Sequence, residues 1–172
     1  MNTAKVEVRA YECAWKTEFE KIKTELGSVL GDLIVGIEHV GSTAVEGMSA
    51  KPCIDIDVVI KDYDVFDAVV VKLADIGYVH EGNLGIRDRE EFKYSDKPHL
   101  MKHHLYVCPQ YSQELRRHIT FRDFLRSNKD AVKKYSAIKE TAARLFPDDI
   151  DKYIKYKSPC IEELYKMCGL KS

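Results

Sequence analysis

The chain of 172 residues lacks several features that define large classes of protein. Its longest apolar runs are far too short to cross a bilayer, and no N-terminal apolar segment precedes a small-residue cleavage site. The formal net charge is only −1, which gives no general attraction to nucleic acid or to an anionic membrane. We therefore expect a globular protein with no membrane partner and no general nucleic-acid binding.

Paired cysteines are missing as well. The five cysteines are scattered without a Cys-x-x-Cys motif, at Cys13, Cys53, Cys108, Cys160 and Cys168. Free thiols of this kind are typical of a reducing compartment, so we expect a cytoplasmic protein. We expect no structural zinc site around Cys108, because the nearby histidines do not have a common zinc spacing and adjacent residues of a strand point to opposite faces.

The composition is ordinary for a folded domain, but the charge is unevenly distributed. Hydrophobic residues make up 45% of the chain and charged residues 32%. Residues 1–108 hold 13 Lys and Arg against 19 Asp and Glu, whereas residues 109–172 hold 14 against 9. An acidic half joined to a basic half suits a metal site that faces a phosphate-binding region, although two ordinary surfaces would give the same totals.

Hydrophobic periodicity predicts an α/β core followed by helices alone. The expected strands lie at about 33–40, 53–60, 77–81, 90–94 and 102–108. The expected helices lie at about 11–30, 63–76, 111–126, 128–146 and 149–168, with Ser127 and Asp130 spaced like a capping box and Leu145 on a buried face. We expect a single domain over residues 1–172, with a core at about 1–108 and a helical extension at about 109–172.

Two carboxylates stand out on the strongest predicted strand. Asp55 and Asp57 are two positions apart, so their side chains share one face of the sheet. Two neighbouring carboxylates repel each other and are costly to bury unless a positive group lies between them. A hard divalent cation such as Mg²⁺ prefers oxygen ligands, so the pair predicts a Mg²⁺ or Mn²⁺ site.

A Gly-Ser turn precedes this strand at a characteristic distance. Twelve residues separate Ser42 from Asp55, and Gly41 and Ser42 follow the predicted strand 33–40. Glycine permits close approach of the backbone, and the serine hydroxyl with neighbouring N–H groups can hold a terminal phosphate. A Gly-Ser turn followed at this distance by Asp-x-Asp is typical of the nucleotidyltransferase superfamily.

The match becomes narrower over longer blocks, and the chain resembles the GrpB family along about residues 8–168. The blocks Ile-Glu-His-Val-Gly-Ser-Thr-Ala-Val at 37–45 and Ala-Lys-Pro-x-Ile-Asp-Ile-Asp at 50–57 carry most of the resemblance, and weaker blocks follow in the helical half. The resemblance implies a nucleotidyltransferase-like mixed sheet flanked by helices. The family domain also occurs fused to dephospho-CoA kinase, and its reaction is poorly defined.

The sequence departs from the superfamily pattern at one important place. Active members usually carry a third carboxylate on a later strand, whereas strand 102–108 offers His104 and Tyr106 on one face. Histidine is a poor ligand for Mg²⁺ and a better one for Mn²⁺ or Zn²⁺, and it can also act as a general base. We therefore predict that His104 faces Asp55, either as a ligand or as a base.

Four further residues are candidates for contacts to phosphate or to a nucleotide. Lys51 enters the strand that carries the aspartates, and Arg122 lies on a basic helix face with His118 and Arg126. Tyr135 and Lys139 are one helical turn apart, so an aromatic ring and an ammonium group share a face. Each could instead belong to an ordinary solvated surface.

These observations predict a metal-dependent enzyme that transfers a nucleotidyl or phosphoryl group from a nucleoside triphosphate to a small, unknown acceptor. The first alternative is a non-catalytic module that binds a nucleotide or a CoA-like ligand and leaves it intact. The second is a structural or regulatory protein with a vestigial pocket. The sequence fixes neither the acceptor, nor the nucleobase, nor the oligomeric state.

Overall fold

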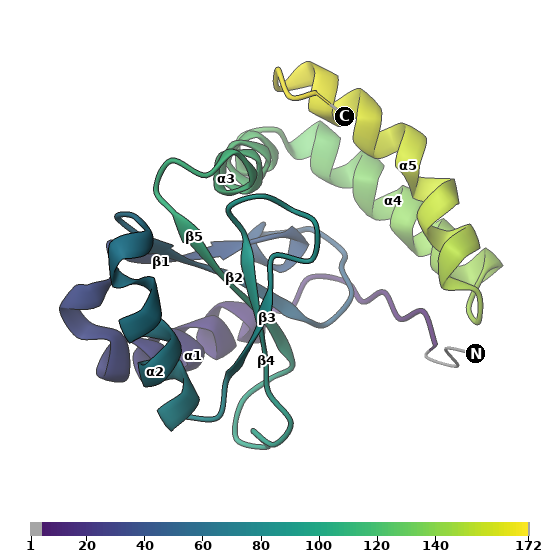
Figure 1. Cartoon of the computed structure of the whole chain (residues 1–172). Helices are drawn as coiled ribbons and strands as arrows, with labels where there is room; N and C mark the ends of the chain where they lie inside the picture. The colour runs from purple at the N-terminus through teal and green to yellow at the C-terminus, as the bar shows by residue number, and fades with distance from the viewer. Residues whose placement is uncertain (1–4, 172) are drawn as a thin grey trace.

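The computed structural model describes residues 5–171, which form a mixed α/β fold with a helical C-terminal region (Figure 1). The strands are β1 (Gly36–Val40), β2 (Ile54–Ile60), β3 (Val79–Gly82), β4 (Glu90–Lys93) and β5 (His103–Pro109). The α-helices are α1 (Ala14–Leu30), α2 (Phe66–Asp75), α3 (Gln113–Arg126), α4 (Lys129–Leu145) and α5 (Ile150–Met167). The predicted fold class is confirmed, and the predicted elements are present with shifts of a few residues at their ends.

The five strands form one sheet in the order β1-β2-β5-β4-β3. Strands β2 and β5 are parallel and central, and the other neighbours are antiparallel. Figure 1 shows α1 and α2 on one side of this sheet and the α4–α5 hairpin on the other. The sheet therefore separates an N-terminal helical layer from a C-terminal one.

The N-terminal layer supplies the main hydrophobic core. The apolar stripe of α1 is fully used, and its buried residues are Trp15, Phe19, Ile22, Leu26 and Leu30. They pack against alternate residues of β2, which are Ile54, Ile56, Val58 and Ile60. Residues two apart on a strand share a face, so the intervening residues of β2 point toward α3, α4 and α5.

The C-terminal helices begin at side chains that accept hydrogen bonds from the first-turn N–H groups. Ser112 caps α3 and Asp149 caps α5 in this way. The predicted cap at Ser127 is wrong. Ser127 ends α3, where its hydroxyl donates to the carbonyl of Asp123, and Asn128 caps α4 instead. Because the Ser127 hydroxyl donates a hydrogen bond to a carbonyl of α3, it caps the end of α3 and not the start of α4.

The α4–α5 hairpin is held to the core at two places. Val45 and Met48, in the loop before β2, pack with residues of α3, α4 and α5 in a second hydrophobic cluster. The N–H of Val6 donates to the carbonyl of Pro147 in the α4–α5 connection at 2.8 Å. Within residues 5–171, none of the helices has the length and apolar character needed to span a membrane.

Candidate functional site

The site is built on the face of β2 that is turned away from the main core. Asp55 and Asp57 both lie on this face, as strand alternation predicts. In the parallel register with β5, Asp55 pairs with His104 and Asp57 pairs with Tyr106. The middle of the sheet therefore brings two acids, a histidine and a tyrosine together under the C-terminal helices.

Gly41 follows β1 and lies directly against Asp55. Its φ is +75°, and a Cβ atom at this position would lie 2.3 Å from Oδ2 of Asp55. Glycine is required here both by the backbone conformation and by the close approach of the carboxylate. Ser42 then begins a three-residue 3₁₀ turn, Ser42–Ala44.

Asp57 does not reach the surface of the site. Its side chain is completely buried, and Oδ2 accepts a hydrogen bond from Nδ1 of His118 at 2.6 Å. Oδ1 of Asp57 has no hydrogen-bond partner among the described residues. The expected shared face is present, but helix α3 places His118 over Asp57, so of the two acids Asp55 alone lines a cavity.

His118 links Asp57 to a third carboxylate. Its Nε2 lies 3.3 Å from Oε1 of Glu114, one turn earlier on α3. Burial is the largest single influence and opposes protonation of His118, but the hydrogen bond to Asp57 and the charges of Asp57, Glu114 and Asp55 together raise the pKa of the imidazole. A protonated His118 donates to Asp57 and forms an ion pair with Glu114, which offsets part of the negative charge around Asp57.

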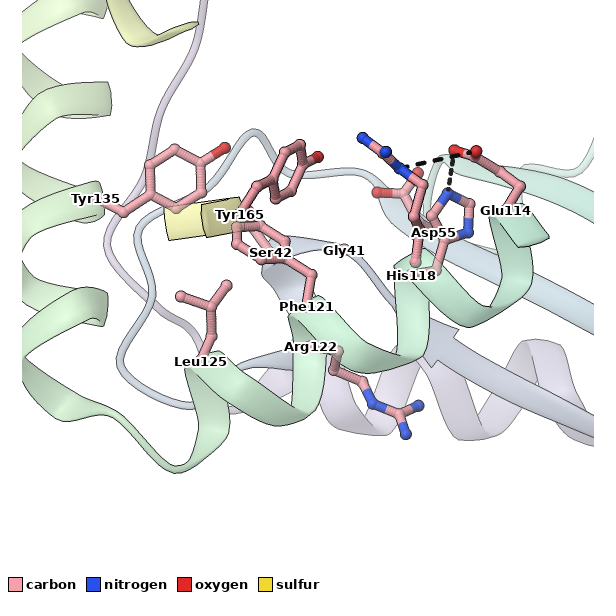
Figure 2. A pocket seen from close by; sticks show the side chains of 11 residues that line it. Gly41, Ser42, Asp55, Glu114, His118, Phe121, Arg122, Leu125, Tyr135 and Tyr165 are labelled. Carbon is pink, nitrogen blue, oxygen red and sulfur yellow. Dashed lines mark ion pairs between the residues drawn. The ribbon is translucent and has the colours of Figure 1, made fainter. Parts of the chain in front are cut away.

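Two cavities meet at Asp55. The first, here called the aromatic cavity, has a volume of about 230 Å³ and is bounded by α3, by Tyr135 of α4 and by Tyr165 of α5 (Figure 2). Phe121 and Tyr165 meet edge to face in it, with ring centroids 4.8 Å apart. Glu114 and His118 lie beside Asp55 at its polar end.

The second cavity, here called the lysine cavity, has a volume of about 270 Å³ and lies between the sheet and the α4–α5 hairpin. Three lysines line it, and they are Lys51, Lys139 and Lys157. Ser42, Asp55 and Tyr135 border both cavities. The Gly-Ser turn and Asp55 therefore form the boundary between a space with three aromatic rings and several charged side chains and a space with three lysines.

Lys139 is the most unusual group in the lysine cavity. It is only 2% exposed, and Nζ donates to Oγ of Ser42 at 2.9 Å. The ammonium group also lies 4.2 Å from the ring centroid of Tyr135. Among the described residues no carboxylate forms an ion pair with it, and burial followed by repulsion from Lys157 lowers its pKa to about 7. A buried, uncompensated lysine is unfavourable in the empty protein and favours an anionic ligand.

Asp55 shows the opposite perturbation. Burial is the largest cause that raises its pKa, to about 7, and the charge of Asp57 adds to it while His118 opposes it. A carboxyl group with a raised pKa is partly protonated at neutral pH. A divalent cation bound nearby would favour its ionised form. The electrostatics of both Asp55 and Lys139 therefore point to charged ligands that the protein alone does not supply.

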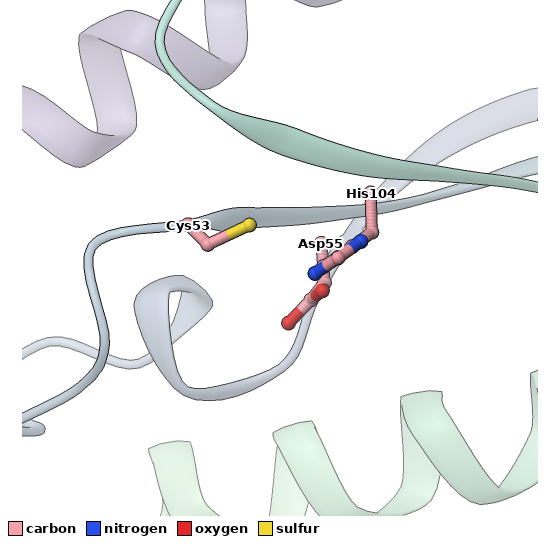
Figure 3. Close-up of side chains that lie close together, drawn as sticks. All are labelled: Cys53, Asp55 and His104. Atoms are coloured by element: carbon pink, nitrogen blue, oxygen red, sulfur yellow. The ribbon is translucent and has the colours of Figure 1, made fainter. Parts of the chain in front are cut away.

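The types of donor atom around Asp55 indicate which cation the site could hold. One atom each from Cys53, Asp55 and His104 lie within 4.8 Å of one another (Figure 3). Burial raises the pKa of the Cys53 thiol to about 11 and lowers the pKa of His104. These residues can hold a divalent cation, with Asp55 as the common ligand and the unpaired Oδ1 of Asp57 as a further oxygen. The accessible set contains nitrogen and sulfur, so it is not the oxygen shell that Mg²⁺ prefers.

Arg122 borders the aromatic cavity, but its guanidinium is paired elsewhere. Its guanidinium donates to Glu38 at 2.7 Å and to the carbonyl of His39 at 3.1 Å, and also pairs with Asp123. Figure 2 shows its side chain directed away from Asp55 and His118. The remaining predicted site residues gather around the two cavities, with Lys51 at the edge of the lysine cavity.

Sequence reasoning missed several residues that the structure brings to the site. His118 was visible only as one member of a basic helical stripe, and Glu114 had no distinguishing pattern. Cys53 did have a signal, because it lies two positions before Asp55 and therefore on the same strand face. Lys157 repeats the Tyr-x-x-x-Lys spacing of Tyr135 and Lys139, and its ammonium group lies 4.9 Å from the ring centroid of Tyr153.

Comparison with known proteins decides the family. A family model described as GrpB protein matches residues 5–167. The chain belongs to the GrpB family. The glutamate-rich protein GrpB of Alkalihalophilus pseudofirmus is 34% identical over 155 residues, which cover 87% of this chain and 88% of that protein. The UPF0157 protein YqkA of Bacillus subtilis is 32% identical over 92% of this chain, and the match spans only 46% of the length of YqkA.

Solved structures agree with this family and show the wider fold. The crystal structure of GrpB from Enterococcus faecalis has a TM-score of 0.78 and 31% identity, and the match covers 94% of this GrpB chain and 98% of the other. More distant neighbours are GLD-2 in its complex with RNP-8, with a TM-score of 0.59 and 13% identity, and the Cid1 poly(U) polymerase bound to MgATP, with a TM-score of 0.53 and 11% identity. The matches cover 94% and 76% of this chain, and 62% and 45% of those chains. The GrpB chain therefore has a nucleotidyltransferase-like fold.

Proposed function

We propose that this GrpB protein binds a nucleoside triphosphate and transfers a nucleotidyl or phosphoryl group to a small acceptor. The observation that carries the proposal is Lys139, which is buried, has no ion-pair partner within residues 5–171 and is hydrogen-bonded to Ser42 beside Asp55. Retaining a cation in this position costs stability, so the cost indicates a function. Its five free cysteines support a cytoplasmic location.

The lysine cavity is the proposed polyphosphate subsite. Lys51, Lys139 and Lys157 bring three positive charges to one space whose only carboxylate is Asp55. Charge-assisted hydrogen bonds from lysine suit phosphate oxygens, and relief of the repulsion between Lys139 and Lys157 adds to the gain. The Ser42 hydroxyl, now bonded to Lys139, lies at the boundary where a terminal phosphate would meet Asp55.

The aromatic cavity is the proposed subsite for the nucleobase. Phe121, Tyr135 and Tyr165 offer ring faces and edges in a space that opens beside Asp55. Base–aromatic stacking accepts any base, and the sequence specifies no particular nucleobase. A nucleotide would then cross the Gly-Ser turn, with its base on one side and its phosphates on the other.

A divalent cation completes the proposed site. Mg²⁺ or Mn²⁺ is the cation that the sequence predicts, and a bound cation supplies charge that offsets the developing negative charge on phosphate oxygens. The fold of a GrpB protein supports this view, because the Cid1 polymerase has the same fold and was solved with MgATP. Asp55 is the ligand that both cavities share.

Binding of ATP to Lys139→Met tests the proposal directly. Calorimetric titration at fixed salt, with and without divalent metal, should show that this variant binds ATP at least about tenfold more weakly than the wild type, since a charge-assisted bond contributes about 1.5–3 kcal/mol. Lys133→Met is the matched control, because Lys133 lies on the same helix and is exposed. Equal affinities of the two variants would contradict the proposal.

A non-catalytic binding module is the second candidate. The sealing of Asp57 under His118 favours it, because two-carboxylate metal chemistry requires that contact to open. Prolonged incubation of the wild type with radiolabelled ATP, metal and a panel of hydroxyl and amine acceptors distinguishes the two. Release of pyrophosphate or ADP that Asp55→Asn abolishes supports the enzyme, whereas tight binding with intact nucleotide supports the module.

A further inference from the structure

The cation site of the lysine cavity has an unexpected ligand chemistry. Cys53 and Asp55 occupy alternate positions at the start of β2, and His104 pairs with Asp55 across the parallel register. Figure 3 shows Asp55 and His104 directed to the same side of the sheet, with the sulfur of Cys53 pointing along the chain toward them. A thiolate, a carboxylate and an imidazole form a set that borderline transition metals bind well and that Mg²⁺ does not.

We propose that Cys53, Asp55 and His104 form a three-ligand site for a transition metal such as Zn²⁺ or Co²⁺. The proposal rests on the proposed function only in sharing Asp55 and the lysine cavity. Three protein ligands leave a fourth position open, which is the arrangement of metal sites that act on a bound molecule rather than stabilise a fold. That position faces a cavity of about 270 Å³.

The competing oxygen site is less accessible. A cation held by Asp55 and Asp57 would have to reach a carboxylate that is fully buried and already bonded to His118 at 2.6 Å. The three donors of the proposed site all line the lysine cavity, so a cation can enter from that side without displacing α3. Accessibility and donor type therefore favour the same set of ligands.

Charge balance supports this assignment. A divalent cation bound to one thiolate, one carboxylate and one neutral imidazole has no net charge. The three lysines of the cavity are then left to contact an anionic ligand, whose charge would favour the protonated form of Lys139. A phosphate oxygen or a water molecule at the open position would complete the tetrahedral shell.

Cobalt spectroscopy of the full chain tests the site without any nucleotide. We expect wild-type protein, titrated with Co²⁺ under reducing conditions, to develop a sulfur-to-cobalt charge-transfer band in the near ultraviolet together with the strong visible bands of four-coordinate cobalt. Zn²⁺ should displace the cobalt at stoichiometric amounts, whereas a large excess of Mg²⁺ should not. Cys53→Ser should abolish the charge-transfer band, and Cys160→Ser, which removes a buried thiol outside the cluster, should keep it.

His104→Gln provides a second measurement that does not depend on the thiol. It should keep the sulfur band and weaken cobalt binding by more than the roughly 10–100-fold losses typical of outer-shell changes. A band that persists in Cys53→Ser, or cobalt and magnesium binding with equal affinity and no sulfur band, would overturn the proposal. The two proposals fail separately: ATP binding without the cobalt band removes the metal site alone, and a cobalt band without ATP binding removes the proposed function alone.

Discussion

The two faces of β2 differ in how their side chains affect the stability of the fold. Ile54, Ile56, Val58 and Ile60 form one face, all are fully buried, and all pack in the main core with α1 and α2. On the other face, Asp57 is fully buried with Oδ1 unpaired among the described residues, and burial raises the pKa of the partly buried Asp55 to about 7. Lys139 lines the adjoining cavity, and within residues 5–171 no carboxylate forms an ion pair with it. One face stabilises the fold, whereas the other stores unfavourable charge that a ligand can relieve. The two-residue period of a single strand therefore separates the core face from the face that carries the candidate site.

A substitution on the core face should have the largest effect on stability. Ile56→Ala removes a fully buried side chain and leaves a cavity, so we expect unfolding to become easier by about 3–4 kcal/mol. Urea denaturation measures this change. Val71→Ala, at a position that is 61% exposed on α2, should cost less than about 0.5 kcal/mol. A similar loss of stability in both variants would contradict the prediction that the core face of β2 stabilises the fold.

A substitution above the other face should have the opposite sign. Lys139→Met keeps most of the side-chain volume and removes a buried charge, so we expect the empty protein to gain on the order of 1–2 kcal/mol at pH 7. The pKa of Lys139 is lowered to about 7, so the wild type should recover this deficit as pH rises from 7 toward 10.5. Thermal melts of both proteins across that range measure the difference, which should shrink with rising pH. A variant less stable than the wild type at pH 7 would show that Lys139 contributes to the fold instead.

The smallest predicted effect concerns a buried histidine beside the Gly-Ser turn. Burial is the main cause that lowers the pKa of His39 to about 4, and Arg126 and Arg122 add to it. Because the unfolded chain binds this proton near pH 6.5 and the folded chain does not, stability is complete above pH 6.5 and falls as the pH drops toward 4. We expect a loss of about 1 kcal/mol between pH 6.5 and 5.5 from this group. Urea titrations at the two pH values should show a smaller loss in His39→Gln, and an unchanged loss would assign it to other groups.

Local patterns were sufficient to predict the fold and one half of the site. Strand alternation placed Asp55 and Asp57 on the same face, and the helical stripe of α1 is buried as expected. Leu145 was expected to be buried, yet it is 53% exposed because it ends α4. Periodicity identifies the apolar face of a helix but does not specify how far along the helix that face remains buried.

The other half of the site depends on tertiary packing that no local pattern encodes. His118 and Arg122 are one turn apart on α3, and the sequence made both candidates for the same basic face. In the structure His118 bonds to Asp57, whereas Arg122 pairs with Glu38. These partners lie 61 and 84 positions away in the chain, so the packing of α3 over the sheet brings them together and the spacing on the helix does not.

The hydrogen bond between Ser42 and Lys139 joins residues that are 97 positions apart in the chain. During translation the Gly-Ser turn and the aspartates are made first, and at about 5–20 residues per second the ribosome needs roughly 5–20 s to reach the lysine. Until then the sheet has a bare acidic face and no basic wall. A ligand of the kind proposed would gain the contact of Lys139 only after α4 has been made, so it would stabilise chains that have completed this contact more than shorter ones.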